Sequence, residues 1–211
     1  HLFTGGSSSF MQTAHDLHQQ RGRSDYDYRQ RLVLNYLWEP PLGKGHTRLA
    51  EGPAAHILGN WRLSGLMTLR SGRPFTIFHS ANNGRVGVPG GFANALADCL
   101  RDGSLPPDQR TPDRWFDQSA YALPPLPRVL GTCGRNTLDG PGLVNFDLSL
   151  NRMLPYFGEG HNLELRWEIF NLFNTPQFGQ PEGNRNSGAF GTIQRLAGDP
   201  RVMQFALKFY Y

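Results

Sequence analysis

The chain has 211 residues, of which 25 are glycine and 16 are proline, and only 18% are charged. Because glycine and proline recur along the chain and break helices, the composition excludes a long-helix protein, and an aromatic content of 12% excludes an acidic disordered chain. The net charge of +4 comes from scattered basic residues, so there is no basic stripe for nucleic acid. No stretch approaches the about 20 apolar residues of a membrane helix. That exclusion does not extend to a membrane β-barrel, whose alternating strands have mild hydropathy.

Residues 1–25 are polar, with glycine and serine near their start, and predict a loop before the first strand. A helical turn near Thr13–Gln20 would place His15 and His18 on one face. Two histidines without a third ligand favour a solvated loop over a metal site.

Five later segments alternate apolar and polar residues, which is the pattern of strands whose two faces meet different surroundings. A bend at Ser71–Pro74 follows the second segment, and Phe75–Phe78 is expected to continue that strand. The pattern predicts an all-β, antiparallel fold of about five strands. The five segments are Tyr26–Trp38, Ile57–Leu69, Val144–Leu150, Asn162–Phe170 and Met203–Tyr211.

The connections between these strands are alternately short and long. In a transmembrane barrel the periplasmic turns are short and the extracellular loops are long, whereas a soluble sandwich has no reason to sort loops in this way. We therefore expect an up-and-down barrel segment whose strands occupy residues 26–211. Its long extracellular loops, residues 79–141 and Asn174–Asp199, should lie at one end of the sheet, and the tight turns at Pro40–Gly45 and Phe157–Gly160 at the other.

The longest connection, residues 79–141, has weak periodicity and two segments, Ala93–Arg101 and Asp113–Ala120, that could form short helices. It also contains Cys99 and Cys133. Oxidation is favoured at a cell surface, and a cross-link helps most in a long loop. We therefore expect a disulfide between them, the alternative being two free thiols.

The apolar faces of the strands could be covered by a second sheet or by lipid. The polar faces combine arginine with carboxylates, which suits a crowded polar barrel interior where ion pairs form. Aromatic residues gather near the short turns, as in the girdle of a membrane barrel. We expect the following apolar residues to point away from the barrel axis: Leu32, Leu34, Leu63, Met67, Phe146, Leu148, Leu165, Trp167, Phe205 and Leu207. The lumen-facing polar residues should be Arg31, Arg62, Asp147, Glu164, Arg166, Glu168 and Lys208.

Signatures of catalysis are missing from the sequence, including the common nucleophile, phosphate and metalloprotease motifs. Glu164 and Glu168 lie on one face of a predicted strand, as acid and base of a glycosidase would. Arg166 lies between them, and so favours a structural ion network. The sequence thus predicts a protein that is not an enzyme and has no catalytic, metal or cofactor site.

Several short sequence blocks, taken together with their order and spacing along the chain, resemble the C-terminal barrel segment of Oar-like TonB-dependent outer-membrane receptors. The resemblance covers about residues 20–211. The most specific block is Glu164–Asn174, followed by Phe178–Gly179. The others are Asp25–Arg31, Gly59–Gly65, Ser71–Phe75, Gly134–Asn136, Gly140–Gly142 and Asn145–Ser149.

This resemblance implies an active transporter with a plugged barrel of about 22 strands, located in the cell outer membrane and energised by the TonB complex. The 211 residues would then be the last part of the barrel. The implied partners are outer-membrane lipid, the missing N-terminal barrel and plug, and the TonB complex through that missing region. The resemblance also implies that the barrel assembly machinery recognises a C-terminal signal formed by Phe205, Leu207, Phe209 and Tyr211.

The expected function is ligand uptake by such a receptor. The alternatives are a non-transporting outer-membrane barrel, acting as an adhesin or passive pore, and a soluble carbohydrate-binding β-sandwich. The ligand is not readable, since Trp115, Phe116 and Asp117 suit sugars, peptides or metal chelates equally well. In a barrel, residues 200–211 should pair antiparallel with residues 162–172 and have no second partner within the chain.

Overall fold

The computed structural model describes residues 18, 21–42, 51–80, 94–155 and 161–211. The chain divides into two compact units. The first contains His1–Gln30, Ser71–Gly142 and Phe178–Ala197, and the second contains Arg31–Arg70, Leu143–Gln177 and Gly198–Tyr211. None of the helices in the described residues is long and apolar enough to cross a membrane.

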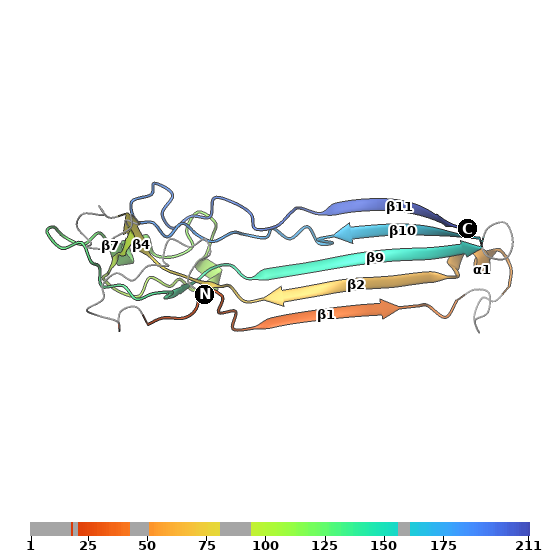
Figure 1. The fold of residues 1–211 in the computed structure, drawn as a ribbon, viewed down its shortest axis with the longest axis horizontal. Coiled ribbons are helices and arrows are strands. Elements are labelled where there is room, and N and C mark those ends of the chain that lie inside the picture. Colours follow the sequence, from red (N-terminus) through yellow and green to blue (C-terminus); the bar gives the residue numbers. More distant parts are fainter. Residues whose placement is uncertain (1–17, 19–20, 43–50, 81–93, 156–160) are drawn as a thin grey trace. The chain divides into compact units, whose positions relative to one another are not determined.

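The second unit is built on one antiparallel sheet of five strands (Figure 1), in the order β1-β2-β9-β10-β11. Spatial order follows chain order, so the topology is up-and-down, as predicted. The sheet is open, and within the described residues the outer edges of β1 and β11 have no partner strand. The pairing predicted for residues 200–211 is confirmed, because among the described strands β11 pairs with β10 and with no other. The strands are β1 (Arg31–Trp38), β2 (Trp61–Arg70), β9 (Leu143–Pro155), β10 (Asn162–Phe170) and β11 (Val202–Tyr210).

The register sorts the side chains of this sheet into an apolar and a polar face. Residues that are direct partners across strands share a face, and Leu34, Met67 and Phe146 are partners in turn across β1, β2 and β9. Followed across all five strands, the register places the ten apolar residues expected to point outward on one face and the seven polar residues on the other. The predicted alternation is therefore confirmed. Arg152 is an exception on the apolar face, and Leu66 is one on the polar face.

Three predicted strand boundaries are wrong, and one of them is the end of the third strand, which extends to Pro155 instead of Leu150. The first strand begins at Arg31, because the backbone N–H of Asp27 donates to the carbonyl of Ser24 at 3.0 Å and closes a turn before it. The second begins at Trp61, because Pro53–Leu58 forms the short helix α1. Proline suits the first turn of a helix, and the helix ends before Asn60, whose φ of 62° cannot continue it.

Both long connections leave from and return to the same end of the sheet. Arg70 at the end of β2 pairs with Leu143 at the start of β9, and Phe170 pairs with Val202 between β10 and β11. At the opposite end Pro155 pairs with Asn162. Three predicted features lie wholly or partly outside the described residues. They are the tight turn at Phe157–Gly160, residues 43–45 of the tight turn at Pro40–Gly45, and the helical turn near Thr13–Gln20, of which only His18 is described.

The first unit contains three two-stranded ladders instead of an irregular loop. β3 (Pro74–Phe75) pairs with β8 (Leu138–Asp139), so Phe75–Phe78 does not extend the second strand. β4 (Phe78–Ser80) pairs with β5 (Asn94–Leu96), and β6 (Asp98–Cys99) pairs with β7 (Tyr121–Ala122). The helix predicted over Ala93–Arg101 is wrong, since β5 and β6 lie there. In Asp113–Ala120 the only helix is the 3-10 turn η2 (Gln118–Ala120). A second 3-10 turn, η1 (Pro107–Gln109), lies before this segment.

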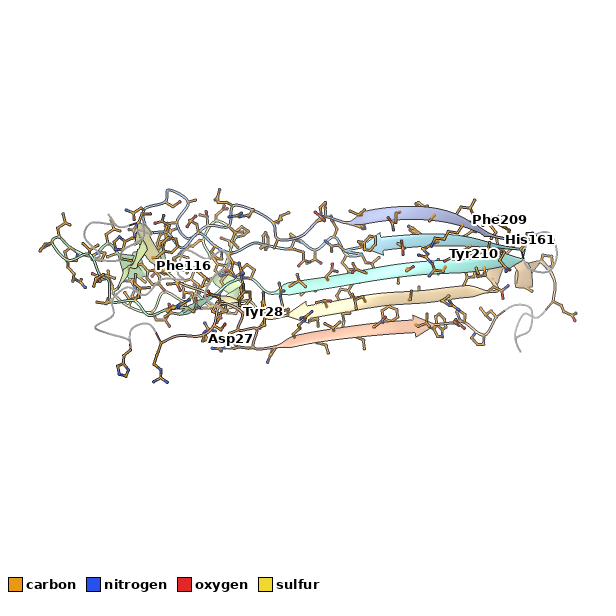
Figure 2. The ribbon with its side chains drawn as sticks, viewed as in Figure 1. Asp27, Tyr28, Phe116, His161, Phe209 and Tyr210 are labelled. Carbon is orange, nitrogen blue, oxygen red and sulfur yellow. A yellow bond between two sulfur atoms is a disulfide. The ribbon has the colours of Figure 1, made fainter. Side chains whose placement is uncertain are left out.

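An aromatic core holds the first unit together. The ring of Phe116 is 1% exposed, and its centroid lies 5.8, 5.5 and 5.1 Å from those of Phe75, Tyr121 and Phe190. Figure 2 shows Phe116 among the short strands of this unit. The sulfur atoms of Cys99 and Cys133 are joined in a disulfide, with 4.8 Å between the Cα atoms. Much of residues 79–141 therefore belongs to a folded unit with its own core.

Candidate functional site

The polar face of the sheet carries a network centred on Arg166. Its guanidinium contacts the Glu164 carboxylate at 2.8 Å and the Glu168 carboxylate at 3.7 Å. The Tyr210 hydroxyl donates to the other oxygen of Glu164 at 2.6 Å, and the Gln204 amide donates to Glu168. The two glutamates are therefore partners in an ion network across β10 and β11, which is the structural role expected from Arg166 between them.

The remaining predicted lumen residues have separate partners on that face. Arg62 forms a 2.6 Å ion pair with Glu39, and both side chains are exposed. Asp147 accepts hydrogen bonds of 2.9 Å from the side chain of Asn145 and from the backbone N–H of Asn171. Arg31 is the cross-strand partner of Arg70. The structure thus places these arginines and carboxylates on one face without gathering them into one pocket.

The four residues of the predicted assembly signal line the apolar side of the edge strand and its end. Phe205 and Tyr211 are 76% and 96% exposed, and Leu207 and Phe209 are also exposed. The Phe205 ring stacks on Trp167 at 5.6 Å, and the Phe209 ring stacks on Tyr211 at 6.2 Å. Figure 2 shows His161, Phe209 and Tyr210 together at one end of the sheet. These side chains are accessible to lipid or protein.

An arginine that the pattern of alternation missed lies on the apolar face near α1. The guanidinium carbon of Arg152 is 5.3 Å from the centre of the Trp61 ring, and its Nε donates to the Gly59 carbonyl at 3.1 Å. The Trp61 indole N–H donates to the Ile57 carbonyl at 3.0 Å. An aromatic and a cation at the end of an apolar face are typical of a membrane boundary.

The candidate ligand residues Trp115, Phe116 and Asp117 have three different fates in the first unit. Trp115 lines a pocket of about 330 Å³ together with Arg29, Arg110 and Asp139. Phe116 is core and cannot contact a ligand. Asp117 accepts from the Ser119 hydroxyl at 2.7 Å and pairs with Arg101 at 2.8 Å. Sequence reasoning missed this pocket. The sequence pattern places Arg29 in a strand and does not single out Arg110, and no motif joins positions so far apart in the chain.

Two ionisable groups of the first unit titrate away from their ordinary values. Hydrogen bonds from Ser119, and then the Arg101 guanidinium, lower the pKa of Asp117 to about 2. Burial raises the pKa of the Tyr121 hydroxyl to about 12. Both groups are therefore fixed in charge near neutral pH, Asp117 ionised and Tyr121 neutral. Within the described part of the chain, no three His, Cys, Asp or Glu side chains are grouped as metal ligands would be. His15 lies outside it.

An open antiparallel sheet with one apolar and one polar face is consistent with a segment of a membrane β-barrel. A protein-family model described as an outer membrane beta barrel domain matches residues 2–204. The chain belongs to this family and is an integral β-barrel component of the outer membrane. No curated protein and no solved structure matches it.

Proposed function

We propose that this chain is the C-terminal barrel portion of an outer-membrane TonB-dependent receptor that takes up a ligand and performs no catalysis. The open sheet carries the proposal. Five strands are present in it, whereas bacterial membrane barrels have even strand numbers of about eight or more. The edges of β1 and β11 therefore need further strands. The blocks similar to Oar-like receptors, above all Glu164–Asn174, support a TonB-dependent parent.

The two faces support an orientation within that barrel. The apolar face suits lipid, and the polar face, with Arg31, Arg62, Asp147 and the Glu164–Arg166–Glu168 network, suits a lumen filled by a plug. Paired charges in a lumen keep their hydrogen bonds, whereas a lysine or arginine in lipid costs about 2–4 kcal/mol at the midplane. On this assignment the end of the sheet that bears the long connections is extracellular.

The exposed edge of β11 supports the proposed partners. An unpaired strand with an apolar face aggregates unless another strand covers it. We assign that role to the N-terminal strand of the same barrel, and assign Phe205, Leu207, Phe209 and Tyr211 to recognition by the assembly machinery. Deleting Phe209 and Tyr211 together from the full-length protein should lower its amount in the outer membrane. Unchanged assembly would contradict this assignment.

The test of the receptor class is binding of the TonB C-terminal domain to the detergent-solubilised full-length protein, measured by surface plasmon resonance. Binding that is lost when the short TonB-binding segment near the N-terminus of the full-length receptor is deleted supports the receptor. An assembled barrel that does not bind TonB would be a non-transporting barrel.

The faces are tested with spin labels at Leu207 and Lys208, adjacent exposed residues of β11. In bilayers, a label at position 207 should relax faster with dissolved oxygen, which partitions into lipid. A label at 208 should respond to a water-soluble nickel chelate instead. The reverse pattern would overturn the lipid assignment, because a one-residue shift exchanges the faces of a strand.

A further inference from the structure

The pocket in the first unit is formed by four segments of the chain that are distant in sequence. Its volume of about 330 Å³ lies at the lower end of the range for small-molecule sites, so it suits one small molecule and not a polymer. Apolar surface comes from Trp115 and Pro107, and polar groups come from two arginines, a serine and an aspartate. The lining residues are Arg29, Ser71, Gly72, Pro107, Arg110, Trp115, Asp139, Gly140 and Gly142.

The charge balance of the pocket favours an anion. Within the described residues, neither Arg29 nor Arg110 forms an ion pair with a carboxylate. The one acidic lining residue, Asp139, is already compensated, since Arg23 donates to its Oδ1 at 2.6 Å. Among the described residues, two guanidinium groups therefore lack a counter-charge, and guanidinium is the group best suited to a carboxylate.

Arg110 is held in place before any ligand binds. The Nε of Arg110 donates to the Leu105 carbonyl at 2.7 Å, and its guanidinium carbon lies 5.8 Å from the centre of the Trp115 ring. Trp115 in turn donates through its indole N–H to the Asp139 carbonyl at 2.9 Å. These bonds use one donor of Arg110 and leave its terminal nitrogens for a ligand. Preorganisation of this kind lowers the entropy that binding costs.

The backbone beside Arg29 and two glycines that line the pocket are also constrained. The N–H of Gln30 donates to the Ser71 hydroxyl at 3.1 Å, and the N–H of Ser71 donates to the Gln30 carbonyl at 2.9 Å. A Cβ on Gly72 would lie 1.8 Å from the carbonyl oxygen of Gly140. Only glycine permits the two segments to approach so closely.

We propose that this pocket binds an acidic sugar, a polyhydroxylated ring that carries a carboxylate. The carboxylate would pair with Arg29 and Arg110, and the ring would pack against Trp115, whose flat face suits it. Asp139 keeps a second oxygen that can accept from a sugar hydroxyl. A carboxylate ligand without hydroxyls would leave that acceptor unused, which is why the polar lining favours a sugar.

Binding by this pocket does not need TonB, but its role as the receptor's capture site rests on the proposed function. The two claims fail separately: loss of TonB binding leaves sugar-acid binding intact, and absence of sugar-acid binding leaves the TonB result intact.

The test uses the full-length protein in detergent and isothermal titration with D-glucuronate, its neutral methyl ester and D-glucose. Glucuronate should bind, and the ester and glucose should bind at least tenfold more weakly, because they lack the charge-assisted hydrogen bonds. Arg29→Gln and Arg110→Gln should each weaken glucuronate binding about tenfold or more. Arg114→Gln is the matched control, since it removes the same charge from a residue that does not line the pocket.

Arg110→Gln could disturb Trp115 and so change the fold as well as the binding. Arg29 is exposed and has no structural partner within the described residues. Arg29→Gln therefore tests ligand binding without affecting folding. Equal affinity for glucuronate and its ester, or an equal loss in Arg114→Gln, would overturn the anion site. Equal or tighter binding of N-acetylphenylalanine, a ring acid without sugar hydroxyls, would overturn the assignment to sugars.

Discussion

Phenylalanine has opposite surroundings in the two units. Phe116 in the first unit is 1% exposed and lies among three other aromatic rings, whereas Phe205 in the second is 76% exposed and stacks on a single tryptophan. Every member of the buried hydrophobic cluster belongs to the first unit. In the described part of the second unit, the buried apolar side chains are Ala55 and Ile169 alone.

This difference shows that the two units obtain their stability from different sources. The first buries aromatic and aliphatic side chains against one another and closes the chain with a disulfide, as a small domain in water does. The sheet satisfies its backbone hydrogen bonds internally and leaves its apolar face uncovered. That face is removed from water only by something outside these residues, and outer-membrane lipid is the cover that we propose.

The largest expected effect is on the core of the first unit. Phe116→Ala should destabilise that unit by about 3–5 kcal/mol, because it removes a large buried ring and leaves a cavity. Hydrogen exchange followed by mass spectrometry should then show faster exchange of residues 94–142, with β10 unchanged. Leu100→Ala, at a site 64% exposed, is the control and should change exchange little. Equal effects of the two variants would contradict a self-sufficient core.

The second prediction addresses the sheet through adjacent residues of β9. Leu148 lies on the apolar face and Ser149 on the polar face, where it is the partner of Glu168. Leu148→Lys should cost about 2–4 kcal/mol, because it places a cation in lipid near the middle of the strand. Ser149→Lys introduces the same charge beside a carboxylate and should be tolerated. Urea unfolding in lipid vesicles measures the difference, and a more harmful Ser149→Lys would reverse the assignment of the faces.

The third prediction concerns the cross-link of the first unit. Cys99 and Cys133 are separated by 34 positions, and loss of a disulfide that closes a loop of this length typically costs about 2–4 kcal/mol. The variant with both cysteines replaced by serine should expose residues 94–142 to protease at a lower urea concentration. The strands of the sheet should keep their protection. Dithiothreitol should reproduce the effect in the natural protein and have none in the variant.

The sheet could be predicted from the sequence because its strands are long. Each has eight residues or more, so a period of two is repeated often enough to fix both strand and face. The alternation alone therefore assigns residues such as Leu165 and Glu164 to opposite faces. The ends of the strands are predicted less accurately than their faces. The alternation of apolar and polar residues cannot show that Pro53–Leu58 forms a helical turn ahead of β2.

The first unit could not be predicted in the same way, because its strands have two or three residues and no measurable period. Its order depends on contacts between distant residues. Asn136 is an example: its side-chain amide donates to the Arg23 carbonyl at 2.7 Å and accepts from the Thr76 hydroxyl at 2.9 Å. The pocket has the same origin, since Arg29 and Arg110 are brought together only by folding.

The smallest expected effect is the pH dependence that Asp117 gives to the first unit. Its pKa falls from an ordinary value of 3.8 to about 2 in the folded chain, chiefly through the Ser119 hydrogen bonds and then through Arg101. A lowered pKa means that the folded state binds a proton less readily than the unfolded state, so this contribution is complete above about pH 4 and disappears as the pH falls towards 2. Asp117→Asn should remove that part of the pH dependence, while Asp113→Asn, at a side chain without a hydrogen bond to any described residue, should retain it. The measurement is the hydrogen exchange of residues 112–122 between pH 5 and 2, corrected for the intrinsic rate. If exchange depends on pH in the same way in the natural protein and in the Asp117→Asn variant, the Ser119 and Arg101 contacts do not stabilise the folded unit.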